Sequence, residues 1–324
     1  MKVAIIGSGS WGTALAAILG EKGLEIRMWA RRAEIANEIN SKRENPQYLP
    51  NVKIPSSVKA HSSLQNAIDQ TDLIISAIPS EFLRSTMKNL KQYYSNQIIV
   101  SVTKGLEHST SERMSQVIEN EIGTSRIAVL SGPNHAEEIG AKKPTASVLA
   151  SKNRKVRNIA AEVLSTPLFK IYQLDDAAGV QICGALKNIT AIATGVVDGF
   201  EFGDNAKASI ITLGLMEINN FGRYFGAKRG TVYGLAGVGD LIATCISRHS
   251  RNRYFGLNIA RGKTIEQARL EMNGMVAEGI PTTKAVHEYI KNHDIEMPLT
   301  KQAYEVLFEG KDVKRAISDL LRLI

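Results

Sequence analysis

The chain has 324 residues, of which 44% are hydrophobic and 22% charged, with 26 Gly, 9 Pro and a formal net charge of +8 at pH 7. This is the composition of a globular protein, and it excludes disordered, collagen-like and fibrous chains. At about 150 residues per domain, the length predicts two domains. The two cysteines, Cys183 and Cys245, are too few for a disulfide framework or a thiolate metal site. We therefore expect no bound metal and a reducing, cytoplasmic location.

The distribution of apolar and basic residues argues against membrane and nucleic-acid partners. The apolar run at the N-terminus is too short for a signal peptide, and no stretch of about 18 uninterrupted apolar residues exists, so we expect no membrane span. Basic residues exceed acidic ones in both halves of the chain, and the one dense basic run, residues 152–157, is typical of a solvated helix face. This diffuse charge suits an anionic small molecule at least as well, and we expect no nucleic-acid partner.

Short β-branched runs alternate with helical patterns from residue 1 to about residue 172. Strands are predicted, in chain order, at Lys2–Ile6, Glu25–Trp29, Asp72–Ala77, Gln97–Val102, Arg126–Leu130, Ala146–Ala150 and Phe169–Tyr172. Helices are predicted between them, among others at Trp11–Lys22, Glu81–Leu90 and Ser111–Glu121. Continuously apolar strands in such an alternation indicate βαβ units and a buried parallel sheet. The predicted fold of this part is a Rossmann-like, doubly wound α/β sheet.

Strand signals nearly stop after Asp175 and Asp176, a pair that is typical of a helix N-terminus. The remaining chain reads as helical, with a long helix from about Asp176 to Val197, another around Ala206–Phe225, and several more up to Ile324. No repeat, low-complexity segment or long polar linker is found in the sequence. We therefore predict a first domain over residues 1–174, an all-helical domain over residues 175–324, and a ligand site in the cleft between them.

A glycine-rich turn, Gly7-Ser-Gly9-Ser-Trp-Gly12, follows the first predicted strand and opens the first predicted helix. In such a turn the first glycine permits the bend, the second lets the backbone approach a pyrophosphate, and the third allows helix and strand to pack closely. The helix N-terminus then presents unpaired N–H groups to phosphate oxygens. The turn alone is a weak signal, but its place between strand and helix favours dinucleotide binding.

The end of the second predicted strand indicates which dinucleotide is bound. An acidic residue there would hold the ribose 2′-hydroxyl of NAD, but the strand runs into Ala30-Arg31-Arg32 instead. Arginines can hold the 2′-phosphate of NADP by charge-assisted hydrogen bonds. Two solvated arginines at the start of a helix are the alternative, and nearby Glu34 keeps NAD open. We predict NADP or NAD as cofactor, with NADPH favoured.

Lys187 is the most informative single residue, because it is the one charged residue between Ala177 and Val197. A lysine on a helix is usually solvated, with its stem covering apolar surface. A solvated helix face would carry more charges, whereas this helix is apolar nearly all round and is therefore expected to be buried. Burial lowers the pKa of an ammonium group toward the range of an acid–base catalyst, so a functional role is favoured.

Three further segments place polar groups where a ligand can reach them. Gly234-Leu-Ala-Gly-Val-Gly-Asp240 puts a carboxylate after three glycines, although Asp240 could also act as a helix N-cap. Residues 250–253, Ser-Arg-Asn-Arg, offer a hydroxyl, a guanidinium and an amide suited to a phosphate. Lys104-Gly105 and residues 131–134 follow predicted strands, and ligands of parallel sheets bind at the carboxyl ends of strands.

Together these residues resemble the NAD(P)-dependent glycerol-3-phosphate dehydrogenases of bacterial type, over nearly the whole chain. The segments that carry the resemblance are GSGSWGTALA near the start, TKGLE at 103–107, SGPNHAEE at 131–138, GALKNI at 184–189, GLAGVGDLIATC at 234–245 and SRNRYFG at 250–256. The resemblance implies a Rossmann-like domain joined to an α-helical domain like that of 6-phosphogluconate dehydrogenase. It also implies reversible reduction of dihydroxyacetone phosphate to sn-glycerol 3-phosphate, which supplies phospholipid synthesis. We expect a homodimer.

The resemblance further implies a role for individual residues. The cofactor would be bound by the three turn glycines Gly7, Gly9 and Gly12, and by Ser10, Trp11, Arg31, Arg32, Lys104, Ala136, Arg251, Val276 and Glu278. The substrate would be bound by Lys104, Gly132, Asn134, Lys187, Asp240, Ser250, Arg251 and Asn252. Many relatives have Ser or Thr followed by Phe where this chain has Asn134-His135, and the Asn134 amide can still donate to a substrate oxygen.

Residue chemistry and resemblance lead to one predicted mechanism. Reduced nicotinamide delivers hydride to the ketone carbon while protonated Lys187 donates a proton to the carbonyl oxygen, with Asp240 orienting the lysine. Arg251 and Asn252 hold the substrate phosphate. The alternatives are a reductase of another phosphorylated substrate or β-hydroxy acid with the same two-domain plan, and a non-catalytic NADP-sensing protein. The isolated charge on a buried helix argues against the latter.

Overall fold

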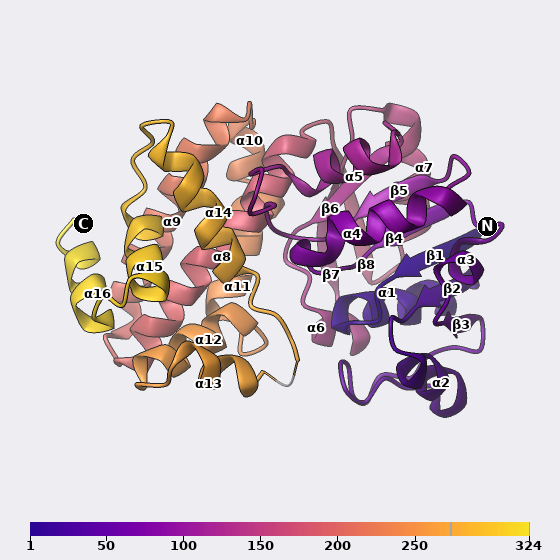
Figure 1. Cartoon of the computed structure of the whole chain (residues 1–324), viewed down its shortest axis with the longest axis horizontal. Helices are drawn as coiled ribbons and strands as arrows, with labels where there is room; N and C mark the ends of the chain where they lie inside the picture. Colours follow the sequence, from indigo (N-terminus) through magenta and orange to yellow (C-terminus); the bar gives the residue numbers. More distant parts are fainter. Residues whose placement is uncertain (273, 324) are drawn as a thin grey trace. The chain divides into compact units, whose positions relative to one another are not determined.

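The computed structural model describes residues 1–272 and 274–323 (Figure 1). Contacts divide the chain into two compact units. The first unit consists of Met1–Thr103 and Met114–Ala177, and the second consists of Lys104–Arg113 together with the chain from Ala178 onward. We call Lys104–Arg113 the docking arm, because its sequence neighbours on both sides belong to the other unit. Residue 324, the end of the expected helical domain, lies outside the described residues.

The first unit is built on one eight-stranded sheet, in the order β3-β2-β1-β4-β5-β6-β7-β8. Its strands are β1 Lys2–Ile6, β2 Glu25–Trp29, β3 Val58–His61, β4 Leu73–Ser76, β5 Ile98–Ser101, β6 Ile127–Ser131, β7 Thr145–Ala150 and β8 Phe169–Leu174. All neighbouring pairs are parallel except β6 and β7. The order reverses direction between β1 and β4, as in doubly wound sheets, so the predicted fold is confirmed.

Two features of the sheet differ from the prediction. Strand β3 was not expected, because Val-Lys-Ala-His at 58–61 is short and half polar, with every second residue buried. Strand β7 is antiparallel to β6, whereas a wholly parallel sheet was expected. The segment between them contains only the short helix α6, Ala136–Gly140, whereas parallel neighbours usually need a longer helical crossover.

Successive strand residues point to opposite sides of the sheet, and because they are apolar on both sides, helices cover both faces. The remaining helices of this unit are α1 Ser10–Glu21, α2 Ala33–Lys42, α3 Leu64–Ile68, α4 Ser80–Leu90, the 3-10 turn η1 Lys91–Tyr93, α5 Met114–Ile122 and α7 Arg154–Leu164. Val3 and Ile5 of β1 share an apolar core with α1, α2 and α7, whereas Ala4 and Ile6 share another with α3, α4 and α5. Helix α5 begins three residues later than expected, since its predicted first turn belongs to the docking arm.

The described part of the second unit is helical apart from the docking arm (Figure 1). Its elements are α8 Ala177–Gly199, α9 Gly203–Tyr224, α10 Arg229–Val232, the π-helical turn η2 Leu235–Gly239, α11 Asp240–Ile246, α12 Arg251–Ala260, α13 Ile265–Leu270, α14 Gly279–Lys291, α15 Pro298–Phe308 and α16 Val313–Leu321. Helix α8 is buried continuously from Gly179 to Val197, as its apolar sequence predicted. Helical content in this part of the chain is thus confirmed.

By length and composition alone, α8 could cross a membrane, and a bent pair formed by residues 229–246 and α12 passes the same test. The most apolar 18-residue window of α8 is completely buried inside the structure. A core helix of a folded domain has the same properties, since it is apolar on every side.

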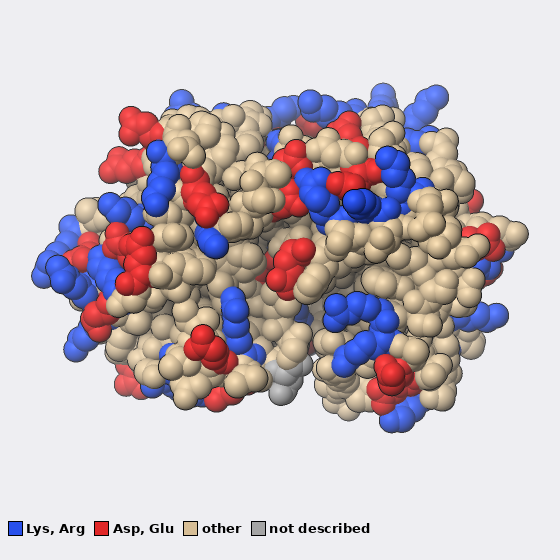
Figure 2. Space-filling view, viewed as in Figure 1, with Lys and Arg blue, Asp and Glu red and all other residues tan. Residues whose placement is uncertain are grey.

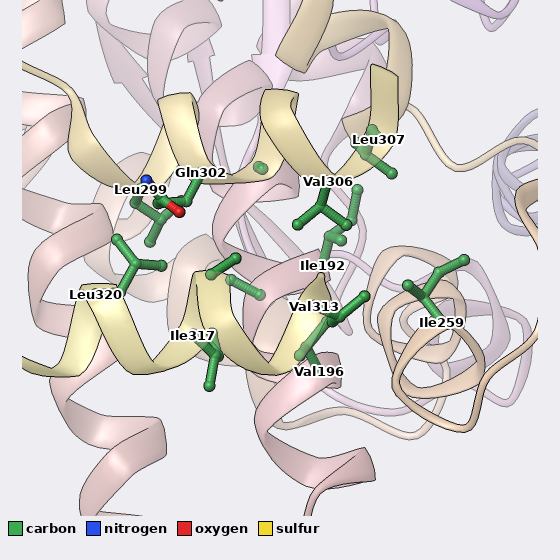
Figure 3. Close-up of a pocket in the computed structure, with 13 residues that line it drawn as sticks. Ile192, Val196, Ile259, Leu299, Gln302, Val306, Leu307, Val313, Ile317 and Leu320 are labelled. Carbon is green, nitrogen blue, oxygen red and sulfur yellow. The ribbon is translucent and has the colours of Figure 1, made fainter. Parts of the chain in front are cut away.

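An apolar cavity lies among α8, α12, α15 and α16 (Figure 3). The volume of the cavity is about 40 Å³. The described lining is aliphatic apart from Gln302. An ordered water needs two to four polar partners, so this cavity is a poor site for water. None of the predicted site residues is among its described lining residues.

Charged side chains are interspersed on the surface. On the face shown in Figure 2, Lys and Arg residues alternate with Asp and Glu residues. This pattern agrees with the even distribution of charge along the sequence.

Candidate active site

Lys187 lies in the middle of α8 and is only 4% exposed. Its Nζ donates hydrogen bonds to Asp240 Oδ1 and, over 2.7 Å, to Thr244 Oγ1. An ammonium group has three N–H donors, and among the described residues these two oxygens are its hydrogen-bond acceptors. One donor is therefore left for another acceptor.

Asp240 is the first residue of α11 and is 1% exposed. The preceding residue, Gly239, is the helix N-cap, so Asp240 does not have the capping role that was its alternative interpretation. The backbone reaches this position through η2, where a Cβ at Gly237 would lie 1.8 Å from the carbonyl oxygen of Val232. The glycine run therefore serves close backbone packing, and the π-helical turn places the Asp240 carboxylate beside Lys187.

Lys104 and Thr244 complete the cluster around this carboxylate. Lys104 Nζ, from the docking arm, lies 2.9 Å from Asp240 Oδ2. Thr244 lies one turn after Asp240 on α11, where its hydroxyl donates to the Asp240 carbonyl oxygen over 2.6 Å while accepting from Lys187. The two carboxylate oxygens of Asp240 thus bind one ammonium group each.

The charges in this cluster strongly affect one another. Burial lowers the pKa of Lys187 to about 7, with Lys104 acting in the same direction and Asp240 opposing them. Burial alone would raise the pKa of Asp240, but Lys104 and Lys187 together hold it below its ordinary value. The cluster therefore keeps a carboxylate ionised next to a lysine that can gain or lose a proton near neutral pH.

The start of α12 is held against α8 by glycines in both helices. A Cβ at Gly195 would lie 2.0 Å from the carbonyl oxygen of Arg253, and one at Gly256 would lie 1.9 Å from that of Ile192. Ser250 caps α12 by accepting from the Arg253 N–H over 3.3 Å. Arg251 is the first residue of this helix, so its side chain is attached at the helix N-terminus, where an anion is favoured.

The side chain of Asn252 is bound within the protein. Its Nδ2 donates to Asn188 Oδ1 over 3.0 Å, and its Oδ1 accepts from the Gly279 N–H over 2.9 Å. Asn188 follows Lys187 on α8, and Gly279 follows Glu278, the N-cap of α14. These bonds join α8, α12 and the start of α14, so the Asn252 side chain connects the elements that carry several predicted site residues.

The glycine-rich turn of the first unit has the geometry of a dinucleotide cradle. Gly7 has φ +119°, and a Cβ there would lie 2.4 Å from the carbonyl oxygen of Ala77. A Cβ at Gly12 would lie 2.0 Å from the carbonyl oxygen of Gly7. A Cβ at Gly9, in contrast, would have no atom within 4 Å. The first and third glycines are thus required for packing, whereas the second leaves open space at the N-terminus of α1.

The two residues after Gly9 are anchored differently. The Ser10 hydroxyl donates to the Tyr48 carbonyl oxygen over 2.6 Å. Trp11 packs edge-to-face on Phe169, and its buried Nε1 has no hydrogen-bond partner among the described residues. Buried donors are seldom left unpaired, so this indole is a candidate for contact with a polar ligand.

Arg31 and Arg32 lie just after β2, separated from it by Ala30, at the carboxyl end of the sheet. The Arg31 guanidinium carbon lies 5.6 Å from the centre of the Phe82 ring. Arg32 Nη2 donates to Gln47 Oε1 over 2.6 Å and to the Tyr48 hydroxyl over 3.1 Å. Both side chains are exposed, and neighbouring groups already hold them in position.

The other predicted residues lie at the ends of elements. Gly132 follows β6, and a Cβ there would lie 3.0 Å from the Ser147 Cα. Asn134 is buried and donates to Ser147 Oγ over 3.0 Å, while Ala136 begins α6. Val276 lies shortly before α14 in the second unit. The candidate residues thus form one set at the carboxyl edge of the sheet and another set around α8.

Sequence reasoning missed the pairing of Lys104 with Asp240 and gave no role to Thr244 or Asn188. Thr244 had a usable signal, because a residue four positions after Asp240 on a helix lies on the same face. No local pattern indicates the other two contacts. Within residues 1–272 and 274–323, no group of three or more His, Cys, Asp or Glu side chains could hold a metal ion.

Two family descriptions match most of the chain. Residues 2–157 match the N-terminus of NAD-dependent glycerol-3-phosphate dehydrogenase, and residues 176–318 match its C-terminus. Glycerol-3-phosphate dehydrogenase (NAD(P)+) of Chlorobium limicola is 44% identical over 325 residues, covering 99% of this chain and 97% of the relative. The enzyme of the same name from Bacillus mycoides is 43% identical, covering 99% of this chain and 95% of the relative.

A solved structure agrees with these matches. The crystal structure of glycerol-3-phosphate dehydrogenase from Coxiella burnetii aligns with a TM-score of 0.95 and 39% identity, covering 99% of this chain and 98% of that one. The resemblance predicted from sequence is confirmed. The chain belongs to the NAD-dependent glycerol-3-phosphate dehydrogenase family.

Proposed function

We propose that this protein reduces dihydroxyacetone phosphate to sn-glycerol 3-phosphate, reversibly, and that it prefers NADPH as the reductant. The observation that carries this proposal is the buried Lys187, which has a proton to give and one N–H donor left after binding Asp240 and Thr244. The membership of the chain in the glycerol-3-phosphate dehydrogenase family supports the choice of substrate.

Lys187 acts as the general acid in ketone reduction. Its ammonium donates a hydrogen bond to the ketone oxygen, and transfers the proton as negative charge develops there. In the reverse direction the neutral amine accepts the proton of the alcohol. Asp240 holds Lys187 by one carboxylate oxygen and Lys104 by the other, so its charge supports the ammonium form without approaching the ketone.

Arg251 and the first turn of α12 bind the substrate phosphate. The guanidinium can hold two phosphate oxygens, and the helix N-terminus adds N–H donors and a partial positive charge. Ser250 contributes from the N-cap position and Lys104 from the docking arm. Asn252 contributes its side-chain amide, which donates one N–H to Asn188 and has a second N–H for a phosphate oxygen. Binding energy from the phosphate orients the reacting ketone.

The glycine-rich turn fits a dinucleotide, as the open space at Gly9 and the unpaired Trp11 Nε1 indicate. We assign residues 1–174 as the dinucleotide-binding domain and residues 175–324 as the substrate-binding and catalytic domain. When bound, reduced nicotinamide supplies the hydride. Its dinucleotide would be held by Gly7, Gly9, Ser10, Trp11, Gly12, Arg31, Arg32, Lys104, Ala136, Arg251, Val276 and Glu278. Gly132 and Asn134 would contact the substrate.

The preference for NADPH rests on the end of β2. Arg31 and Arg32 are exposed there, and the contacts of Arg32 with Gln47 and Tyr48 fix its guanidinium before a ligand arrives. A pre-positioned guanidinium loses less entropy on binding a 2′-phosphate. Glu34 lies in the first turn of α2 rather than at the end of the strand.

A homodimer and a cytoplasmic location complete the proposal. Helices α9 and α11 expose Met216, Ile242 and Ile246, at 57%, 42% and 59% of their surfaces. A second copy of the chain is the proposed partner, and these side chains are candidates for its interface. Two buried free thiols agree with a reducing compartment. The product would serve glycerophospholipid synthesis.

The test compares three compounds in one assay of nicotinamide absorbance. Dihydroxyacetone phosphate should be reduced with NADPH. Dihydroxyacetone, which lacks the phosphate, should react with a kcat/KM lower by at least about a hundredfold, because the remote binding energy is lost. 6-Phosphogluconate should not be oxidised with NADP. Equal rates for the first two compounds, or turnover of the third alone, would overturn the proposed substrate.

A further inference from the structure

The docking arm supplies Lys104, and its internal structure determines where that lysine lies. The arm closes on itself through an antiparallel bridge between Leu106 and Arg113, and the Glu107 N–H donates to the Glu112 carbonyl oxygen over 2.9 Å. Gly105, between Lys104 and Leu106, has φ +151°, a conformation that other residues rarely adopt. The arm is therefore a formed hairpin-like element.

Leu106 is the buried anchor of the arm. It is 1% exposed and belongs to the apolar core of the second unit, together with residues of α8, α9, α11 and α14. Two further side-chain contacts connect the arm to the second unit. His108 Nε2 lies 3.2 Å from Glu288 Oε1 of α14, with both side chains over two-fifths exposed, and the Arg113 guanidinium carbon lies 5.9 Å from the Phe225 ring centre. Complete burial of an aliphatic side chain contributes more than an exposed ion pair, so we take Leu106 as the anchor of the arm.

The position of Lys104 depends on this attachment because only Gly105 separates the two residues. Gly105 lets the chain turn between these two residues. The ammonium group of Lys104 is held by Asp240, and the backbone that follows Lys104 is held where Leu106 enters the apolar core. An ammonium group on a four-carbon stem has many rotamers, and ordering it requires a fixed backbone.

We propose that Leu106 is a positioning residue, which seats the docking arm in the helical core and thereby holds Lys104 on Asp240 in the reactive arrangement. Leu106 touches neither substrate nor cofactor in this account and acts through Lys104 alone. The inference rests on the proposed function for its kinetic consequence, but the seating of the arm can be measured without catalysis.

The experiment is a double-mutant cycle between Leu106→Ala and Lys104→Met. Leu106→Ala should lower kcat/KM for dihydroxyacetone phosphate by about 10- to 100-fold, the scale of an ångström-sized misplacement. In the Lys104→Met background the same substitution should change kcat/KM by less than about twofold, because the residue through which it acts is gone. Leu106→Met, which preserves volume, should restore most of the loss.

Leu320→Ala is the matched control. Leu320 lies on α16, is 2% exposed and belongs to the same apolar core, so the same atoms are deleted from the same cluster. It should lower the melting temperature while leaving kcat/KM near wild type in both backgrounds. If Leu106→Ala folds poorly, Leu106→Val provides a milder deletion with the same cycle. Equal losses of kcat/KM with and without Lys104 would overturn the proposal.

A second readout separates this proposal from the proposed function. The rate at which an amine-reactive acylating reagent modifies Lys104, followed by mass spectrometry, needs no turnover. It should rise severalfold in Leu106→Ala and stay unchanged in Leu320→Ala. If the wild type does not reduce dihydroxyacetone phosphate, the proposed function fails while this rate still tests the arm. An unchanged rate in Leu106→Ala would overturn the positioning role.

Discussion

Lys104→Met should shift the pH dependence of catalysis upward. As the proposed proton donor in the reduction of dihydroxyacetone phosphate, Lys187 must be protonated, so kcat should fall as the pH rises through its pKa of about 7. In the oxidation of glycerol 3-phosphate the neutral amine is needed, so kcat should rise through the same pKa. Lys104 lowers this pKa, and its removal should therefore raise it.

The size of the shift follows from the shared carboxylate. Lys104 Nζ lies 2.9 Å from Asp240 Oδ2, and Lys187 binds the other oxygen of the same group. Two unit charges on the order of 5 Å apart, at an effective dielectric constant of about 20, repel each other by about 3 kcal/mol, or about two pKa units. Relaxation of the cluster should reduce this, so we expect an upward shift of about 1 to 2 units.

The assay is the pH profile of kcat in both directions, because kcat reports groups in the substrate complex. KM is expected to rise as well, since Lys104 is also proposed to bind substrate, but KM does not enter this comparison. Lys311→Met removes a remote lysine that is paired with Glu305 and Asp319, and its profile should match wild type. A midpoint that stays in place or moves downward in Lys104→Met would refute the electrostatic reasoning.

Three further predictions test other parts of the structure. Arg31→Ala with Arg32→Ala should weaken NADPH binding by about 10- to 100-fold per arginine engaged while sparing NADH; equal losses for both cofactors in binding titrations would contradict a 2′-phosphate contact. Asp240→Asn should lower the free energy of unfolding, measured with denaturant, by about 3–5 kcal/mol, because two ammonium groups lose their carboxylate. Lys187→Met should cost less, because Asp240 stays paired with Lys104. Burial raises the pKa of Glu217 to about 7, although its carboxylate accepts hydrogen bonds from the N–H groups of Leu299 and Thr300. Because the pKa of Glu217 is higher in the folded than in the unfolded protein, the stability that this group contributes at pH 4 is lost as the pH rises through 7. The free energy of unfolding should differ between pH 5 and pH 8 by about 2–3 kcal/mol less in Glu217→Gln than in wild type. An equal difference in the two proteins would exclude this role of Glu217.

The elements that the sequence predicted best are those whose own residues determine burial. Strands such as β1 and β4 are continuously apolar, and α8 is apolar on all sides, so each could be assigned without knowing its neighbours. Strand β3 failed that criterion, because an edge strand buried on one side carries a short and mixed pattern. The start of α5 was wrong because the helical pattern continued backward into the docking arm.

Within the candidate site, the sequence predicted which residues matter better than it predicted how they meet. The contact of Lys187 with Asp240 followed from the need of a buried ammonium for an anion. The position of Lys104 on the same carboxylate did not, because it depends on an arm that belongs to the helical unit although it lies between β5 and α5 in sequence. The sequence also gave no sign that the Asn252 side chain, predicted to bind a phosphate, has hydrogen bonds with Asn188 and Gly279 as well.

Turnover of dihydroxyacetone phosphate by Lys187→Ala tests whether Lys187 transfers the proton. We expect kcat to fall by about 10²- to 10⁴-fold while NADPH binding stays near wild type. Lys207→Ala is the control, since it removes another largely buried lysine, paired with Asp198, and should leave kcat unchanged. A folded Lys187→Ala protein with the wild-type kcat would show that Lys187 does not transfer the proton.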